Sequence, residues 1–316
     1  MMWNNSSIQN HNDSTGHINI FFVCMYSFIS VVGFILNLLA LVFFLHHANY
    51  RSQTIVYMTN LVIADVLLIL TLPVRIYYHL GFDNLPQWLC EALGLVLKAN
   101  MYGSIFLLTS ICFDRCMAVN FPMSSRVQRG RKKAPLVCLG IWMLTFGASV
   151  PIYLSKHQQV THIDCFDGLP VYATKPAVVL TTLFVGFGIP LVIMLICSWG
   201  LARAVRRSSV AQTDLVDGRK IQRMITTSLL IFILSFLPYH AILVLLSLYG
   251  EDIPYPMRAA YRYSLMLACF NTVLDPVVYY FTTDTFKMNV NMGAVRRMFL
   301  LNSQSSETHR SRIPNS

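Results

Sequence analysis

Seven uncharged or nearly uncharged runs dominate this 316-residue chain and limit what it can fold into. Each run is long enough to cross the ~30 Å hydrocarbon core of a membrane as a helix that rises about 1.5 Å per residue. We therefore expect an all-α membrane protein, a bundle of seven transmembrane helices. The runs cover residues 18–45, 55–74, 92–113, 134–155, 176–202, 224–249 and 263–283.

Composition agrees with a membrane protein, because 55% of the residues are hydrophobic and 12% are charged. A soluble domain carries about twice that share of charge. Lys and Arg gather in segments 46–54, 120–133, 203–223 and 284–300 and are scarcer in the alternate segments. Short loops rich in Lys and Arg stay in the cytoplasm, so the N-terminus is predicted to be extracellular and the C-terminus cytoplasmic.

The net charge of +10 therefore lies mostly on the cytoplasmic side. Anionic lipid headgroups or an acidic protein partner would meet it there. We expect no nucleic-acid partner, because the basic residues are spread over several loops of a membrane protein.

The two ends of the chain differ in character from residues 18–283. Residues 1–17 are polar and contain three acceptor triplets for N-glycosylation, which suits an extracellular segment. Residues 284–300 mix apolar and basic positions at helical spacing, which predicts a short amphipathic helix on the inner membrane surface. Residues 301–316 are polar and rich in Ser, so a disordered cytoplasmic tail is expected. The acceptor triplets begin at Asn4, Asn5 and Asn12.

Asp114 and Arg115 end the third apolar run. A charged pair at the end of a membrane helix is costly unless the charges pair or reach water, so it marks a functional site by default. An ordinary ion pair at the membrane interface is the alternative. Two further motifs place a proline inside a membrane helix: Phe-Leu-Pro238-Tyr in the sixth run and Asp275-Pro-Val-Val-Tyr279 in the seventh.

Together these motifs resemble the rhodopsin-like (class A) G-protein-coupled receptors. The chain departs from the family pattern at Cys116, where the family has Tyr, and at Phe236, where it usually has Trp. The resemblance implies a plasma-membrane receptor, not an enzyme, with a heterotrimeric G protein as cytoplasmic partner and with arrestin and a receptor kinase as further partners. It also implies a set of activation residues, although an apolar triad within that set would serve equally as plain core. The set is Asp114, Arg115, Pro190, Ile105, Phe232, Phe236, Pro238 and Tyr279.

Asp65 lies in the middle of the second run, where a lone carboxylate must neutralise or bind a cation. The resemblance assigns this position to a sodium site completed by Ser104, Asn271 and Asp275. Asp275 stands where many receptors have Asn, so the two carboxylates favour a bound Na⁺ or one shared proton. A protonated, purely structural Asp65 is the alternative. No other cofactor is expected.

Cys90 and Cys165 are the two of eight cysteines predicted to lie outside the cell. Oxidation of this pair would tie the second outer loop to the third helix, and the family resemblance implies the same bond.

Several cations lie at the outer ends of the predicted helices, which favours an anionic ligand. Three motifs resemble the purinergic/lysophospholipid branch of the family, most of all lysophosphatidic acid receptors of the non-endothelial-differentiation-gene type. The motifs are Leu-Pro-x-Arg-Ile-Tyr-Tyr, Asn-Met-Tyr-Gly-Ser-Ile and Phe-x-Pro-Tyr-His. We expect an anionic lipid, such as lysophosphatidic acid, to bind these residues, although Arg75 has the alternative of extending to water. The expected ligand residues are Arg75, Lys98, Tyr102, His240, Arg258 and Arg262.

Two alternatives stay open. Nucleotide receptors of this branch pair a helix-six His with a cation three residues later, but here Leu243 follows His240. A polyphosphate would lose a contact of about 1.5–3 kcal/mol, although another small anion would not need it. A membrane transporter is the alternative from a different class. It should show inverted repeats, and no such self-similarity is visible.

Overall fold

The computed structural model describes residues 19–46, 53–82, 84–121, 124–156, 165–166, 176–207, 214–249 and 253–282, and every regular element in these ranges is helical. The predicted glycosylation sites, the amphipathic segment 284–300 and the tail 301–316 lie outside the described residues. The elements are α1 (Ile20–His46), α2 (Gln53–Ile69), α3 (Leu72–His79), α4 (Gln87–Asn120), α5 (Ser125–Arg131), α6 (Ala134–Lys156), α7 (Pro176–Thr181), the π-helix η2 (Thr182–Gly188), α8 (Ile189–Arg207), α9 (Asp214–Tyr249) and α10 (Tyr255–Thr282).

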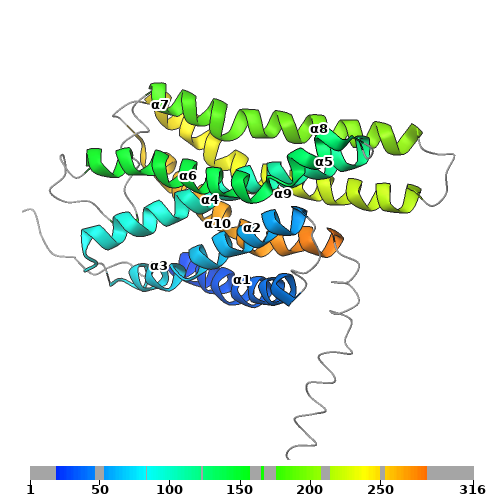
Figure 1. Ribbon diagram of the computed structural model, residues 1–316. Helices are drawn as coiled ribbons and strands as arrows, with labels where there is room; N and C mark the ends of the chain where they lie inside the picture. Colours follow the sequence, from blue (N-terminus) through cyan, green and yellow to red (C-terminus); the bar gives the residue numbers. More distant parts are fainter. Residues whose placement is uncertain are drawn as a thin grey trace, which may run out of the picture.

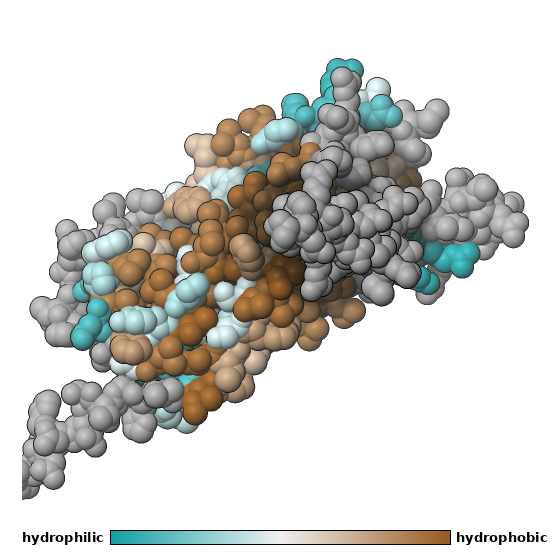
Figure 2. Space-filling view, turned by 90° about the horizontal axis from the view of Figure 1, so that it is seen from below, coloured by the Kyte–Doolittle hydropathy of each residue, from teal (hydrophilic) through white to brown (hydrophobic). Residues whose placement is uncertain are grey.

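These helices follow the seven apolar runs, which confirms the predicted all-helical bundle. The second run is divided between α2 and α3, and the fifth between α7, η2 and α8. Within the described residues, five segments have the length and hydropathy to cross a membrane, and Ala134–Ala148 is a shorter apolar helix. Figure 2 shows the result as a broad band of apolar surface with polar residues toward its edges.

Helix α4 lies at the centre of the bundle and packs against α2, α6, α8 and α9 (Figure 1). This position explains why so much of its length is buried, including the uncharged polar residues Asn100, Ser104 and Thr109. Contacts of α1 with α2 and α10, and of α9 with α8 and α10, close the ring around it.

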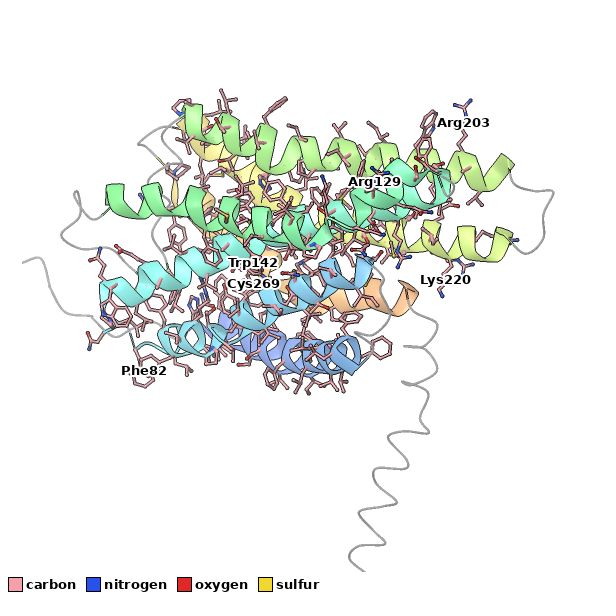
Figure 3. All side chains as sticks on the ribbon, viewed as in Figure 1. Phe82, Arg129, Trp142, Arg203, Lys220 and Cys269 are labelled. Atoms are coloured by element: carbon pink, nitrogen blue, oxygen red, sulfur yellow. A yellow bond between two sulfur atoms is a disulfide. The ribbon has the colours of Figure 1, made fainter. Side chains whose placement is uncertain are left out.

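The two ends of the bundle carry different side chains. In Figure 3, Arg129, Arg203 and Lys220 lie together at one end, whereas Phe82 lies at the other. The basic end is the one assigned to the cytoplasm by the distribution of Lys and Arg. The disulfide between Cys90 and Cys165 is present, with the two Cα atoms 5.2 Å apart. The sequence prediction of this bond is therefore confirmed.

A proline divides the second membrane segment. Pro73 has no N–H to donate to the carbonyl of Ile69, four residues earlier, and its ring crowds that carbonyl, so α2 ends at Ile69. The hydroxyl of Thr71 donates to the carbonyl of Leu68 at 2.6 Å, which satisfies a group at the break. The chain then resumes as α3, and this new start sets the direction in which Arg75 projects.

Pro190 has a different effect on the fifth segment, because a wider helical turn precedes it. The N–H of Ile189 donates to the carbonyl of Phe184, five residues earlier, at the end of the π-helix η2. Proline cannot donate to the carbonyl one turn back, and π-turns are one way in which a helix accommodates that gap. The sequence analysis predicted one span over residues 176–202 and did not predict this π-turn.

Polar side chains join the helices inside the apolar band. Nδ2 of Asn37 on α1 donates to the carbonyl oxygens of Gly33 at 3.0 Å and of Thr272 on α10 at 2.7 Å. Nε1 of Trp142 on α6 donates to the amide oxygen of Asn60 on α2 at 2.9 Å. These bonds matter because hydrocarbon offers polar groups no other partner.

We predict that Asn37→Ala lowers the free energy of unfolding by about 1–3 kcal/mol, because it leaves the buried carbonyl of Thr272 without this donor. Thermal unfolding of purified protein in detergent measures the loss. Leu38→Ala is the matched control, since Leu38 is 43% exposed on the same helix and should shift the midpoint much less. Equal shifts for the two variants would contradict the prediction.

Candidate functional site

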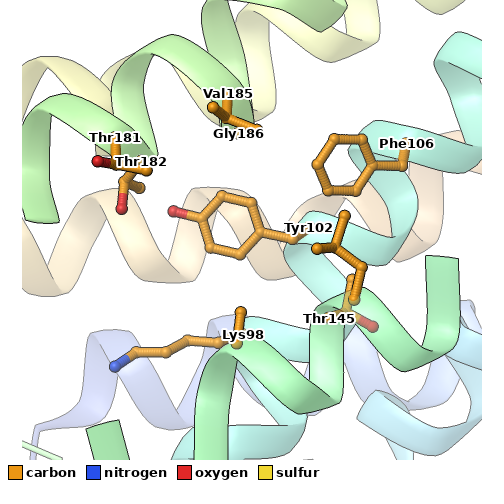
Figure 4. A pocket seen from close by; sticks show the side chains of 10 residues that line it. Lys98, Tyr102, Phe106, Thr145, Thr181, Thr182, Val185 and Gly186 are labelled. Atoms are coloured by element: carbon orange, nitrogen blue, oxygen red, sulfur yellow. The ribbon is translucent and has the colours of Figure 1, made fainter. Parts of the chain in front are cut away.

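A largely apolar cavity of about 210 Å³ lies between α4, α6 and the π-helix η2. Lys98, Tyr102 and Phe106 of α4 line it together with residues of α6, α7 and η2. Figure 4 shows the Tyr102 ring between the helices, and the Lys98 ammonium pointing away from Phe106. Among the lining residues, Leu144, Val185 and Thr181 are exposed on the bundle surface, so the cavity opens toward the membrane.

Gly186 lets Tyr102 occupy this cavity. A Cβ built on Gly186 would lie 2.8 Å from Cε1 of Tyr102, closer than side-chain packing allows. The hydroxyl of Tyr102 is buried and faces Tyr239 of α9. The ring therefore forms one wall of the cavity.

Arg75 of α3 is buried, with 3% of its surface exposed. Nη2 donates to the carbonyl of Leu93 on α4 at 3.4 Å, and the guanidinium carbon lies 4.4 Å from the ring centroid of Phe166, next to the disulfide. Nε has no hydrogen-bond partner among the described residues. The side chain thus points into the bundle and does not extend to water, which excludes the alternative considered from the sequence.

His240 of α9 is also buried and stacks on Phe187 of η2, with ring centroids 4.5 Å apart. Its Nδ1 lies 2.8 Å from the carbonyl oxygen of Phe236, and its Nε2 has no partner within the described part of the chain. His240 meets Tyr102 edge to face at a centroid distance of 6.0 Å. It therefore lies behind the cavity wall and supports Tyr102.

The structure brings only part of the predicted ligand set together. Lys98 and Tyr102 line the cavity, whereas Arg75 approaches α4 from the α3 side. Arg258 is exposed near the start of α10, and Arg262, one turn later, is partly exposed.

The four residues of the predicted sodium site are all fully buried. The carboxyl groups of Asp65 and Asp275 contact each other. Nδ2 of Asn271 donates to Asp275 at 2.6 Å, and Nδ2 of Asn100 donates to Asp65 at 3.2 Å. Oxygens without a hydrogen-bond partner remain on Asp65, Ser104, Asn271 and Asp275. Unpaired oxygens next to two carboxylates fit a hard cation, and a proton shared by the carboxylates would fit as well.

The predicted activation residues lie in two groups. Ile105, Phe232 and Phe236 are buried in one core cluster, and Phe187 stacks on Phe232 at 5.2 Å. Asp114 accepts a hydrogen bond from the Thr54 hydroxyl of α2 at 2.6 Å. Arg115 lies at the inner end of α4, and Pro190 is buried at the start of α8. Pro238 lies inside α9, and Tyr279 belongs to α10, although its side chain is outside the described part of the chain.

Comparison with known proteins shows which family has this architecture. Residues 36–279 match the profile of the family described as "7 transmembrane receptor (rhodopsin family)". The chain is a rhodopsin-family receptor. The receptor is 33% identical over 291 residues to lysophosphatidic acid receptor 6 of Mus musculus, an alignment that covers 87% of this chain and 84% of the relative.

Two human relatives align over similar lengths. Lysophosphatidic acid receptor 4 of Homo sapiens is 30% identical over 286 residues, covering 87% of this chain and 77% of that protein. G-protein coupled receptor 68 of Homo sapiens is 34% identical over 290 residues, covering 89% and 78%. The percentage of identical residues therefore does not show whether this chain is more similar to lysophosphatidic acid receptors than to other members of the family.

Membership in this family settles the class of protein. The chain is a multi-pass receptor of the plasma membrane that couples to G proteins, and it is not an enzyme. The transporter alternative is therefore wrong.

The sequence analysis missed several residues that complete these groups. Phe166 lies next to the disulfide and contacts Arg75, whereas the π-helix η2 places Phe187 against His240 and Gly186 against Tyr102. None of these contacts follows from position in the sequence. Thr54 and Asn100 are ordinary polar residues in apolar helices, and a polar side chain at such a position was the signal that could have found them.

We predict that sodium raises the midpoint of thermal unfolding more than choline does at equal ionic strength. A cation between Asp65 and Asp275 would bind the folded state only. Each kcal/mol that binding adds to the free energy of unfolding raises the midpoint by about 2–4 °C. Asp65→Asn and Asp275→Asn should each abolish the difference between the salts. Identical midpoints in sodium and choline for the unaltered receptor would instead assign a shared proton to the pair.

Proposed function

We propose that this receptor responds to an anionic lysophospholipid, and that lysophosphatidic acid is its agonist. The observation that carries the proposal is the buried guanidinium of Arg75, which keeps an unpaired Nε at the extracellular end of the bundle. A positive charge that is removed from water without a negative partner is costly, so a site of this kind favours an anion that neutralises the guanidinium.

No carboxylate forms an ion pair with Arg75 among the described residues, and its described partners are a carbonyl and an aromatic ring. A phosphate monoester would supply the missing negative charge through charge-assisted hydrogen bonds, which arginine forms in a bidentate geometry. Lys98 lines the apolar cavity from α4, so it would offer a second cation to an anionic lipid whose chain enters that cavity.

The apolar cavity beside Lys98 supports the second half of the proposal. Its volume of about 210 Å³ is below the ~300–1,000 Å³ of sites that enclose a whole drug-sized ligand. It therefore suits a segment of an acyl chain whose remainder extends between α6 and η2 into the membrane. Such a chain gains about 0.8 kcal/mol for each methylene group transferred from water.

A nucleotide suits this arrangement less well. Nδ1 of His240 is already engaged by the Phe236 carbonyl, His240 lies behind Tyr102, and the second cationic anchor is replaced by Leu243. The membrane-facing opening of the cavity would also have no role for a water-soluble polyphosphate.

Agonist binding would act through contacts already present between the cavity and the inner end. Tyr102 touches His240, His240 stacks on Phe187, and Phe187 stacks on Phe232 of α9. A ligand that moves Tyr102 would bias the position of α9 relative to α4, where Arg115 would meet the G protein. An agonist can shift this equilibrium only by its difference in affinity for the two conformations.

We predict that Arg75→Gln and Lys98→Gln each weaken the response to lysophosphatidic acid by about 10-fold to 100-fold, the equivalent of one charge-assisted contact. A Gα-dissociation reporter in cells measures the response, and surface labelling confirms expression. The matched ligand control is a monoacylglycerol with the same chain and no phosphate, which should be a weak agonist. Unchanged potency in both variants would rule out this anchor.

We predict that Gly186→Ala also lowers potency, because the added methyl group displaces Tyr102 into the cavity. Gly103→Ala is the matched control, since Gly103 follows Tyr102 on α4 and a Cβ there meets nothing within 4 Å. The loss should grow with the chain length of the lysophospholipid, because the cavity receives the chain and not the headgroup. A loss independent of chain length would place the acyl chain elsewhere.

A further inference from the structure

Three free thiols meet where α4, α8 and α9 pack together near the inner end of the bundle. Cys112 and Cys116 lie one turn apart on α4, and Cys197 lies on α8. The thiol of Cys116 lies next to that of Cys197 where α4 packs against α8, and the thiol of Cys112 lies beside the hydroxyl of Ser228 on α9. Helices α4 and α8 pack directly against each other, which holds this arrangement in place (Figure 1).

The members of the cluster differ in their access to the cytoplasm. Cys116 is partly exposed and lies one turn before Asn120, the exposed last residue of α4. Nδ2 of Asn120 donates a hydrogen bond to Sγ of Cys116 at 3.2 Å. Cys197 and Cys112 are buried, at 4% and 0% exposure. A soluble oxidant therefore reaches Cys116 first, and Cys197 is the thiol in contact with it.

We propose that Cys116 and Cys197 form an oxidation-sensitive dithiol, which a peroxide converts into a disulfide that joins α4 to α8. Cys116 directly follows Arg115 on α4, so a bond between Cys116 and Cys197 would change the receptor at its cytoplasmic end.

The chemistry balances with one peroxide for each disulfide. The deprotonated sulfur of Cys116 attacks one peroxide oxygen, the O–O bond breaks, and the sulfur becomes a sulfenic acid while the other oxygen leaves as water. The sulfur of Cys197 then attacks the sulfenic sulfur, the S–S bond forms, and the hydroxyl leaves as a second water. Two thiols are oxidised, and hydrogen peroxide is reduced to two waters.

The cytosol keeps such a bond transient, because glutathione and thioredoxin reduce accessible disulfides. The disulfide between Cys90 and Cys165 lies at the opposite end of α4, outside the cell, and persists. One helix would thus carry a permanent bond at its outer end and a reversible one at its inner end. The reversible bond would hold α4 and α8 in the contact that the structure shows.

The test is a linkage assay on the full-length receptor with a protease site inserted between residues 166 and 176. Cleavage separates Cys116 from Cys197, while Cys90 and Cys165 remain together in the N-terminal fragment. Membranes are treated with hydrogen peroxide, free thiols are alkylated, and the cleaved receptor is run on a non-reducing gel. We expect the fragments to migrate as one band in treated samples, and as two bands without peroxide or after reduction.

Single substitutions assign the bond. Cys116→Ser and Cys197→Ser should each abolish the linkage, whereas Cys112→Ser and Cys269→Ser should leave it intact. Two separate fragments from the peroxide-treated, unsubstituted receptor would overturn the proposal. So would linkage that survives Cys116→Ser or depends on Cys112.

A second measurement uses the receptor without any substitution. Phenylarsine oxide condenses with two adjacent thiols and releases one water, so it should protect Cys116 and Cys197 from alkylation and prevent the later linkage. Alkylation of both cysteines despite the arsenical would count against a dithiol. Neither experiment contains a lipid agonist, so its outcome is independent of the ligand proposed above.

Discussion

Hydrocarbon offers backbone N–H and C=O groups no hydrogen-bond partner, and this constraint governs the rest of the receptor. Every described regular segment is helical, and polar side chains inside the apolar band bond either to a carbonyl of their own helix or to a neighbouring helix. Asn37 joins α1 to α10, and Trp142 joins α6 to Asn60 on α2. The buried acids near the centre also have amide partners: Asn100 of α4 donates to Asp65 of α2, and Asn271 donates to Asp275 within α10.

The candidate ligand site arises where the helical pattern is interrupted. Pro73 ends α2 and starts α3, which directs Arg75 toward α4. Pro190 is preceded by a π-helix, which brings Gly186 against Tyr102 and Phe187 against His240. Both interruptions lie in the outer half of the bundle, so the backbone irregularities and the proposed ligand contacts have a common origin.

Much of the architecture was predictable from residue order alone. The seven spans, the orientation and the bond between Cys90 and Cys165 depend on hydropathy, loop charge and compartment, which are properties of the sequence. The acid pair was also predictable, since a carboxylate within an apolar helix is conspicuous wherever the helix lies. The predicted ligand set was less complete, because distance along the chain does not tell which cations share a cavity.

The sequence by itself determined that the chain crosses a membrane as helices, which end faces the cytoplasm, and which residues carry charge into the apolar layer. Only the tertiary structure decided that Arg75 turns inward against Leu93 and Phe166, that His240 lies behind Tyr102, and that Cys116 meets Cys197. The physical reason is that hydrophobicity acts on each segment separately. Contacts between side chains depend instead on how the helices rotate and where prolines interrupt them, and that is settled only when neighbouring helices pack.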